Sequence, residues 1–488
     1  MSVLAGARRV LALALETHRD DPALVAHLRA QAARLEEPLR VAIAGKVKAG
    51  KSTLLNALVG EDVAPTDAGE CTRVVTWYRD GSVPRVVLHP RTGGAEPLPV
   101  RREDGALVID LQGTPAEDVE RLVVDWPAES LRTATLIDTP GIASTSAATS
   151  QRTVAFLDPD DDTPTEADAV VYLMRHLHAA DAQFLESFRD RGVARATAVN
   201  TVAVISRADE IGGGRVDAMF SARGIAARYR GDPTVRGLCQ DVVAVAGLLA
   251  QTGRTLRHAE YTALAGLAAR PRAELDADLL SVARFRRSGA DGDTEPRERL
   301  VRRFGLFGIR LATMLIRQGA ATPDALSTEL VARSGLVELQ NVLHTQFTGR
   351  RELLKARSAL LAVERLPAAR GGGPLAREVE RVLAGAHEFT EVRVLGALRA
   401  GVVDLPRAVV PEAERLLGAA GAAPAARLGL PPDAPVAELT AAAFEALQRW
   451  RRHSANPMHG RAAVDACHAV VRSCEGVLAG LPRPVRAP

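Results

Sequence analysis

The periodicity of apolar residues along this chain is helical in some regions and strand-like in others. Residues 2–38 repeat apolar positions every three to four residues, which predicts two amphipathic helices. Asp21-Pro22 is expected to end the first helix and to cap the second. Because an isolated helical pair cannot bury its own apolar stripe, this pair should pack against a later part of the chain.

Between residues 40 and about 250 the sequence pattern changes to short runs of β-branched residues, separated by predicted turns and helices. Strands are predicted at 40–44, 74–78, 85–89, 108–111, 121–125, 133–137, 169–173 and 201–205. Helical stretches follow the first, seventh and eighth of these runs, as in a mostly parallel α/β sheet. The middle runs are joined by short turns, so we expect an antiparallel edge.

Beyond about residue 255 the helical period dominates. Helices are predicted at 255–285, 296–318, 322–366, 375–400, 407–419, 435–455 and 459–480. We therefore expect three parts: N-terminal helices at 1–38, an α/β domain of the phosphate-loop type at 39–254, and a helical bundle at 255–488.

Composition narrows the class of protein. A chain of 488 residues with 47% hydrophobic and 25% charged residues is typical of a globular protein of several domains. The net charge of +3 is nearly balanced, which argues against a nucleic-acid partner. No uncharged segment reaches the ~18–20 residues that a spanning helix needs. We therefore expect a cytoplasmic protein, and any membrane contact should be peripheral, at the inner face of the cell membrane.

The pattern Gly45-x-x-x-x-Gly50-Lys51-Ser52 lies between a predicted strand and a predicted helix, which is the setting of a phosphate-binding loop. Backbone N–H groups of such a loop enclose a phosphate at the positive end of the helix. Lys51 is expected to bridge the β- and γ-phosphates, and the Ser52 hydroxyl to bind Mg²⁺. The nucleotide should touch Gly45, Lys46, Val47, Lys48, Ala49, Gly50, Lys51, Ser52 and Thr53.

Two further segments complete the predicted phosphate site. Asp138-Thr139-Pro140-Gly141 ends a predicted strand, so Asp138 should hold Mg²⁺ through water and the Gly141 N–H should meet the γ-phosphate. Thr72 is the predicted switch residue that completes the Mg²⁺ shell and aligns the attacking water. Thr66 is the alternative, and Thr72 is favoured because it directly precedes the next strand.

Ser206-Arg207-Ala208-Asp209 follows another predicted strand and should recognise the base. A carboxylate at Asp209 can accept two N–H groups of guanine that adenine does not offer, so GTP is the expected substrate, with Mg²⁺ as cofactor. The usual form of this motif is Asn or Thr, then Lys, x, Asp; the stem of Arg207 can still lie along a base. Ala246 and Gly247 are expected in the last base-contacting loop.

These motifs resemble those of the dynamin superfamily, and of bacterial dynamin-like proteins in particular. More closely, PLRVAIAGKVKAGKSTLLNALVG, ATLIDTPG, RSGLVELQNVLHTQF and RWRRHSANPMH are similar to the mycobacterial isoniazid-inducible dynamin-like proteins, over nearly the whole chain. The resemblance implies a GTPase head, a neck of N- and C-terminal helices, and a stalk. It also implies membrane remodelling and self-association through GTPase domains, or association with a related dynamin-like GTPase.

The loop departs from its eukaryotic relatives in its middle. Dynamins carry Gln where this chain has Val47, and Ser, which helps to hold a monovalent cation, where it has Lys48. One hypothesis is that the Lys48 ammonium replaces that cation; the other is that Lys48 points into solvent. Lys46 is interpreted as a solvated or dimer-facing charge.

Three hypotheses about the function remain. The first is a dynamin-like GTPase that remodels membranes, for which Trp450–His453 and the loop 366–375 are the candidate membrane contacts. Trp450–His453 could instead be the polar face of a helix in the bundle. The second is a slow regulatory or scaffolding GTP-binding subunit of a related GTPase, which Val47 favours. The third, a ribosome-assembly GTPase, is disfavoured by the near-neutral charge and the split helical flanks.

Overall fold

The computed structural model describes residues 2–66, 74–140, 166–175, 181–182, 185, 200–288, 294–399 and 401–482. Its first feature is the predicted helical pair, α1 (Val3–Thr17) and α2 (Pro22–Arg34). The Asp21 side chain accepts a hydrogen bond from the N–H of Leu24, with Pro22 in the first turn, as the sequence predicts.

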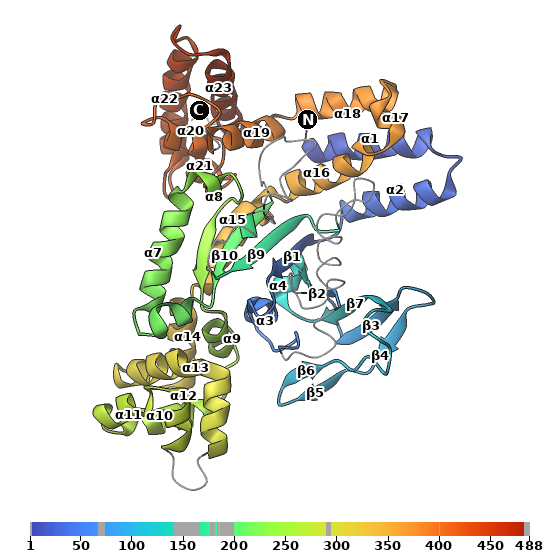
Figure 1. Cartoon of the computed structure of the whole chain (residues 1–488). Helices are drawn as coiled ribbons and strands as arrows, with labels where there is room; N and C mark the ends of the chain where they lie inside the picture. The colour runs from blue at the N-terminus through green and yellow to red at the C-terminus, as the bar shows by residue number, and fades with distance from the viewer. Residues whose placement is uncertain are drawn as a thin grey trace, which may run out of the picture.

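A nine-stranded sheet occupies the middle of the described structure (Figure 1). Its spatial order is β11-β10-β9-β1-β8-β2-β7-β3-β4. These strands are β1 (Leu39–Gly45), β2 (Thr76–Asp80), β3 (Arg85–Pro90), β4 (Glu96–Leu98), β7 (Val119–Trp126), β8 (Ala134–Asp138), β9 (Ala169–Met174), β10 (Thr201–Ser206) and β11 (Val242–Val245). From β11 to β8 all neighbours are parallel, whereas β3 is antiparallel to both β7 and β4. The mixed, mostly parallel sheet with an antiparallel edge is thus confirmed.

One predicted strand is largely wrong. Instead of 108–111, the chain forms β6 (Ala106–Val108), which pairs with β5 (Arg101–Glu103) in a separate two-stranded sheet. Strands β4, β5 and β11 were not predicted. Runs of three or four residues are too short to show the alternation that marks a strand.

Helices of the sheet domain cover both faces and frame the phosphate loop. They are α3 (Lys51–Val59), α4 (Glu129–Thr133), α7 (Ala218–Gly231), α8 (Pro233–Arg236), α9 (Gly247–Arg254) and the 3₁₀ turn η2 (Ala208–Gly213). Because β1 and α3 are joined only by Lys46–Gly50, the loop lies at the carboxyl end of a central strand, where α/β sheets place their ligands.

The helices after residue 255 form three groups (Figure 1). The first packs beside α9 and consists of α10 (His258–Ala269), α11 (Arg272–Asp278), α12 (Val282–Arg287), α13 (Thr294–Arg317) and α14 (Pro323–Arg333). The second includes the helices that receive α1, and consists of α15 (Leu336–Gln346), α16 (Arg351–Glu364), α17 (Pro367–Arg370) and α18 (Pro374–Gly385). The third consists of α19 (His387–Arg399), α20 (Val410–Leu416), α21 (Pro424–Leu428), α22 (Val436–Ser454) and α23 (Arg461–Gly480).

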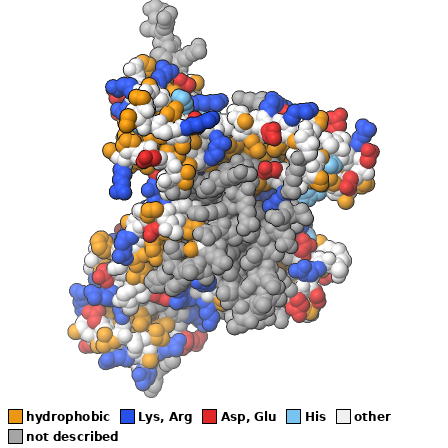
Figure 2. Space-filling view, turned by 45° about the horizontal axis from the view of Figure 1, so that its top comes forward, with side chains coloured by type: hydrophobic (Ala, Val, Ile, Leu, Met, Phe, Trp, Pro, Cys, Tyr) orange, Lys and Arg blue, Asp and Glu red, His pale blue; other side chains and the backbone are white. Residues whose placement is uncertain are grey.

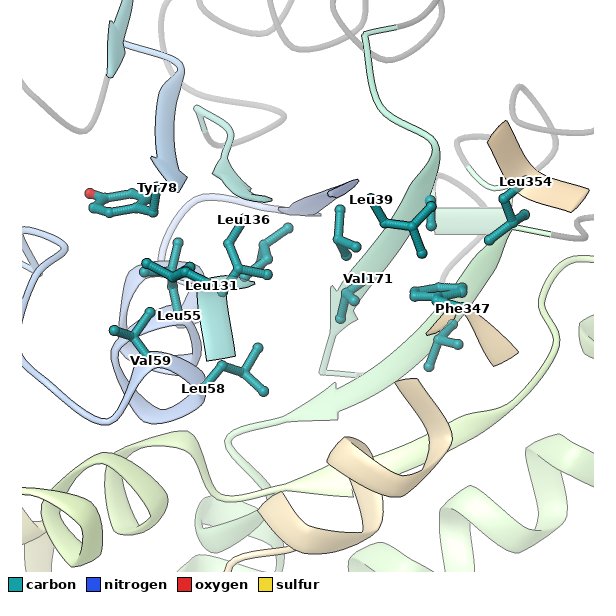
Figure 3. Close-up of a cluster of buried hydrophobic side chains, with 14 of the residues drawn as sticks. Leu39, Leu55, Leu58, Val59, Tyr78, Leu131, Leu136, Val171, Phe347 and Leu354 are labelled. Carbon is teal, nitrogen blue, oxygen red and sulfur yellow. The ribbon is translucent and has the colours of Figure 1, made fainter. Parts of the chain in front are cut away.

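The apolar core crosses these groups. Figure 3 shows Leu39 and Val171 of the sheet in one cluster with Leu55 of α3 and with Phe347 and Leu354 of the second helical group. A second buried cluster joins the other face of the sheet to α10, α13 and α14. The sheet therefore shares its hydrophobic stabilisation with helices from the C-terminal half.

The third helical group has its own core around Trp450, Cys467 and Cys474. Trp450 is 0% exposed, so the prediction that it could anchor the protein at a membrane interface is wrong. Its ring belongs instead to the buried cluster that α22 and α23 share, whereas its neighbours Arg451 and Arg452 are exposed. The two cysteines are buried free thiols.

Candidate nucleotide-binding site

The phosphate loop has the backbone shape that its glycines allow. Gly45 has a φ of 149°, and a Cβ there would come within 2.5 Å of the carbonyl oxygen of Leu173 on β9. Gly50, at the cap of α3, has a left-handed φ of 92°. Lys51 and Ser52 open α3, and the Lys51 Nζ lies 3.4 Å from the carbonyl oxygen of Gly45. The Lys51 side chain therefore folds back over the loop that should hold the phosphates.

A magnesium site would form beside this loop. The Ser52 hydroxyl donates a 2.6 Å hydrogen bond to Oδ2 of Asp138, at the end of β8. The other oxygen of Asp138, Oδ1, is buried and accepts no hydrogen bond from any residue that the structure describes. A hydroxyl and a carboxylate oxygen are hard ligands of the kind that Mg²⁺ prefers. The residues present thus fit the ion.

Burial shifts the pKa values of the two charged groups beside the phosphate loop. It raises the pKa of the Asp138 carboxyl, although the Lys51 ammonium and the Ser52 hydroxyl oppose the shift. It also lowers the pKa of Lys51, against the attraction of Asp138. Both groups are therefore poorly solvated, which strengthens their interaction with a phosphate or a metal ion.

The neighbouring strands fix this corner in place. The hydroxyl of Thr139 donates a 2.9 Å hydrogen bond to the carbonyl oxygen of Ile43 in β1, which ties the end of β8 to the strand that feeds the loop. Asn56 is a residue that sequence reasoning missed. Its buried amide bonds the N–H groups of Val63 and Ala64 and the carbonyl oxygen of Ala64, so it positions the segment that leads toward the predicted switch.

A cavity of about 180 Å³ adjoins the loop and is the candidate base pocket. It is lined by Ala49, Gly50, Thr53, Leu54, Leu173, Val204, Ser206, Arg207, Asp209, Glu210, Val245, Gly247 and Leu248. Seven of these were predicted from motifs. The apolar ones were not, because a leucine or valine at the end of a strand carries no signal of its own.

The base-recognition motif has a defined geometry. Arg207 takes a left-handed φ of 52°, and its guanidinium donates a 2.8 Å hydrogen bond to Glu210. The Ser206 hydroxyl is turned toward the carbonyl oxygen of Met174, at 3.3 Å, so it braces β10 against β9. Burial raises the pKa of Asp209, whose carboxyl lines the cavity. Ala246 is fully buried and does not line it.

Three loop residues were left open by the sequence. Val47, at 46% exposure, and Lys48 face solvent, and Lys48 has a left-handed φ of 61°. Lys46 does not stand free in solvent as interpreted: its Nζ lies 2.8 Å from Oδ2 of the buried Asp181. The predicted Thr72 and Gly141 lie outside the described residues, and Thr66 is exposed.

Sequence comparison shows to which family the chain belongs. Residues 41–92, which contain the phosphate loop, match the Dynamin family. Over 494 residues, covering 98% of this chain and 99% of the relative, the chain is 43% identical to the isoniazid-induced protein IniC of Mycobacterium tuberculosis. The chain belongs to the bacterial dynamin-like proteins. Its family, predicted from the motifs, is thus confirmed, and the dynamin family domain implies that it binds GTP.

Other bacterial dynamin-like proteins are similar over shorter stretches or at lower identity. One from Nostoc punctiforme is 33% identical over 123 residues, which cover 22% of this chain and 17% of that protein. Among solved structures, a chain of an oligomerised bacterial dynamin pair, described as sensing and tethering membranes, aligns over 79% of both chains. The identity is 14% and the TM-score 0.31.

Proposed function

We propose that this bacterial dynamin-like protein hydrolyses GTP to GDP and phosphate and couples this reaction to remodelling of the cytoplasmic membrane. The observation that carries the catalytic part is the Ser52–Asp138 hydrogen bond with the orphaned Oδ1 beside Lys51. These groups suit a complex of phosphate and metal ion. The Asp138 carboxylate would gain a metal ion and the Lys51 ammonium would gain a phosphate, and each would then have a partner of opposite charge.

The residues then have separate roles. Lys51 would neutralise charge at the bridge between the β- and γ-phosphates, while the N–H groups at the start of α3 hold the β-phosphate. Ser52 and Asp138 would hold Mg²⁺, which when bound neutralises charge on the phosphate oxygens. Thr72 and Gly141 stay predicted contacts of the attacking water and the γ-phosphate. Asp209 would accept the guanine N–H groups in the base pocket.

Lys48 is the proposed substitute for the monovalent cation of related GTPases. Its left-handed backbone is uncommon for a residue with a Cβ, and such conformations persist mainly where the surroundings impose them. The conformation fixes the direction in which the exposed Lys48 side chain leaves the loop, and the compact ammonium at its end would have to turn toward the transferred phosphate when nucleotide binds. A potassium titration of GTP turnover tests this. Activity independent of potassium is expected, and strong potassium dependence of the unmodified protein would exclude the idea.

Membrane remodelling requires a peripheral contact. Among the described residues, no helix is long and apolar enough to span a bilayer. With Trp450 buried, the candidate that remains from the sequence is the segment 366–375, in which Gly371, Gly372 and Pro374 are exposed. It is not a simple loop as predicted, because it forms α17 and the start of α18 and its Leu375 is buried in the core. On the face drawn in Figure 2, basic and acidic side chains are interspersed over the described surface. We propose a location in the cytoplasm, at the inner face of the cell membrane.

The deciding experiment measures GTP turnover with and without anionic liposomes, alongside co-sedimentation and electron microscopy of the vesicles. Binding, stimulated turnover and altered vesicle shape are expected. Turnover without lipid binding or stimulation would remove the remodelling function and leave a GTPase. The Lys51→Ala variant serves as the control for nucleotide-dependent effects.

A second function has one observation in its favour. Val47 is exposed and apolar, so it cannot position a water through a side-chain hydrogen bond. A slow GTP-binding subunit that regulates or scaffolds a related dynamin-like GTPase would need no such group. Turnover that stays slow at high protein concentration and with liposomes, but rises when a related bacterial dynamin-like protein is added, would favour this function. Self-association through GTPase domains would instead make turnover rise with protein concentration.

A further inference from the structure

Lys46 is held by a buried acidic group. Its Nζ lies 2.8 Å from Oδ2 of Asp181, and the hydroxyl of Tyr172 donates a 2.8 Å hydrogen bond to Oδ1 of the same carboxylate. Tyr172 belongs to β9, and Asp181 follows that strand. The Asp181 side chain is 1% exposed and that of Lys46 38%, so the pair reaches from the protein interior to the loop surface.

The burial of Asp181 makes this pair different from an ordinary surface ion pair. An exposed pair contributes little, whereas removing one partner of a buried charge leaves that charge uncompensated. Burial and the Asp181 carboxylate raise the pKa of Tyr172, so its hydroxyl stays a donor at any physiological pH. Lys46 and Tyr172 thus satisfy both oxygens of one buried carboxylate.

The same strand also touches the backbone of the loop. Gly45 pairs with Leu173 in parallel register, and any side chain at Gly45 would collide with the Leu173 carbonyl oxygen. The first turn of the phosphate loop therefore contacts β9 directly through the backbone of Gly45, and indirectly through the side chain of Lys46, whose partner Asp181 accepts a hydrogen bond from Tyr172 of β9. Lys48, with its left-handed φ, follows two residues later.

We propose that Lys46 is a positioning residue, which with Asp181 and Tyr172 forms a brace that holds the first turn of the phosphate loop against β9. The brace pairs the Lys46 charge with Asp181 and leaves the backbone N–H groups of the loop preorganised for the phosphates. Preorganised donors cost no reorganisation at the moment of reaction. This inference rests on the proposed GTP hydrolysis for its catalytic part, and on nucleotide binding alone for the rest.

The test compares Asp181→Asn, Lys46→Gln and their double variant with the unmodified protein. Fluorescent GDP titration, steady-state GTP turnover and thermal unfolding are measured for each. We expect GDP affinity to fall about three-fold and kcat about ten-fold in each single variant, with the double variant no worse than either. A purely structural role would lower the unfolding temperature and the active fraction while GDP affinity and kcat per bound nucleotide stay unchanged.

Arg215→Ala is the matched control. Arg215 lies between η2 and α7 and forms an exposed ion pair with Asp217 at 3.4 Å. Its loss should change GDP affinity and kcat by less than about two-fold. If Asp181→Asn and Lys46→Gln behave like this control, or if their effects simply add, the brace is refuted.

If both single variants fail to fold, Tyr172→Phe replaces them, because it keeps the ion pair; GDP affinity should then fall about two-fold, and unchanged affinity would refute the brace. If the unmodified protein binds GDP but does not turn over GTP, the proposed hydrolysis fails. The GDP titration then still decides on the brace.

Discussion

Two buried aspartates flank strand β9 in the chain, Asp168 directly before it and Asp181 several residues after it, and they join different parts of the protein. Asp181, beyond the carboxyl end, binds Lys46 of the phosphate loop. Asp168, at the amino end, accepts hydrogen bonds from Arg34 of α2 at 3.2 Å, from the N–H of Arg40 at 3.0 Å and from Ser358 of α16 at 2.9 Å. We call this second group the neck hub: Asp168, Arg34, Ser358 and the N–H of Arg40.

The difference lies in what each aspartate organises. The glycines and the cap of α3 already determine the shape of the phosphate loop. Asp181 only adjusts the position of this loop, and its effect should therefore be on the nucleotide site. The neck hub ties the N-terminal helices, the sheet and the C-terminal helices at one point, with Asp168 only 2% exposed. Damage at the first end should therefore appear in catalysis, and damage at the second in the stability of the whole fold.

The largest expected effect is on stability. Asp168→Ala removes the carboxylate that faces the buried guanidinium of Arg34, and should lower the free energy of unfolding by about 3–5 kcal/mol. Urea denaturation measures it. The control, Glu36→Ala, removes an exposed ion pair with Arg8 and should cost less than about 1 kcal/mol. Equal losses in the two variants would show that the neck hub does not join the three segments.

At the phosphate end, Lys51→Ala should lower GTP turnover about 100- to 1000-fold, because it removes the charge that faces the β- and γ-phosphates. Its unfolding temperature without nucleotide should be unchanged or higher, since the Lys51 ammonium is poorly solvated and burial lowers its pKa. Turnover assays and thermal unfolding check both. A drop in unfolding temperature as large as that of Asp168→Ala would contradict the division between the two ends.

The base pocket predicts a pH dependence of nucleotide binding. Burial raises the pKa of Asp209, and only the ionised carboxylate can accept both guanine N–H groups. GDP affinity should therefore fall as the pH is lowered from about 7 toward 5. Asp209→Asn should bind GDP about ten-fold more weakly at neutral pH, with a flatter pH profile. An equally steep profile in that variant would assign the titration to another group.

The smallest expected effect is at the neck hub's neighbour, Lys355. This buried ammonium donates a hydrogen bond to the carbonyl oxygen of Arg34, and burial lowers its pKa to about 8 from 10.5. Between these values the folded state has lost the proton that the unfolded state still holds, so stability rises with pH; below about 8 both states are protonated. From pH 8 to 10 the unmodified protein should gain about 1–2 kcal/mol relative to Lys355→Met. A constant difference would show that Lys355 keeps its ordinary pKa.

The predictable part of the site was the part encoded by neighbouring residues. Gly45, Gly50, Lys51 and Ser52 lie within one short stretch of the chain, and their spacing between a predicted strand and a predicted helix is typical of a phosphate-binding loop. Asp138 and Asp209 could be added because each ends a strand of a parallel sheet, and such ends meet along one edge. The same logic could not find Asn56 or Asp181, whose partners depend on how elements pack.

Trp450 shows that a local sequence pattern can also suggest a wrong role. A tryptophan followed by two arginines has the composition of an interfacial anchor, yet the ring lies in the core of the third helical group. The helical period places one face of α22 inward, but it does not say whether a bundle, a bilayer or a partner covers that face. Only the packing of α23 against α22 decides it.

The sequence alone predicted a loop of the phosphate-binding type, a mostly parallel sheet and flanking helices, because local spacing and apolar periodicity reflect short-range backbone sterics. Its motifs also resembled those of the bacterial dynamin-like proteins, the family that the relatives confirm. The tertiary structure decided the partners of its lysines: Asp181 for Lys46, the Arg34 carbonyl for Lys355. These contacts join residues more than a hundred positions apart, and burial in a shared core, which no local pattern reports, is what gives them their strength.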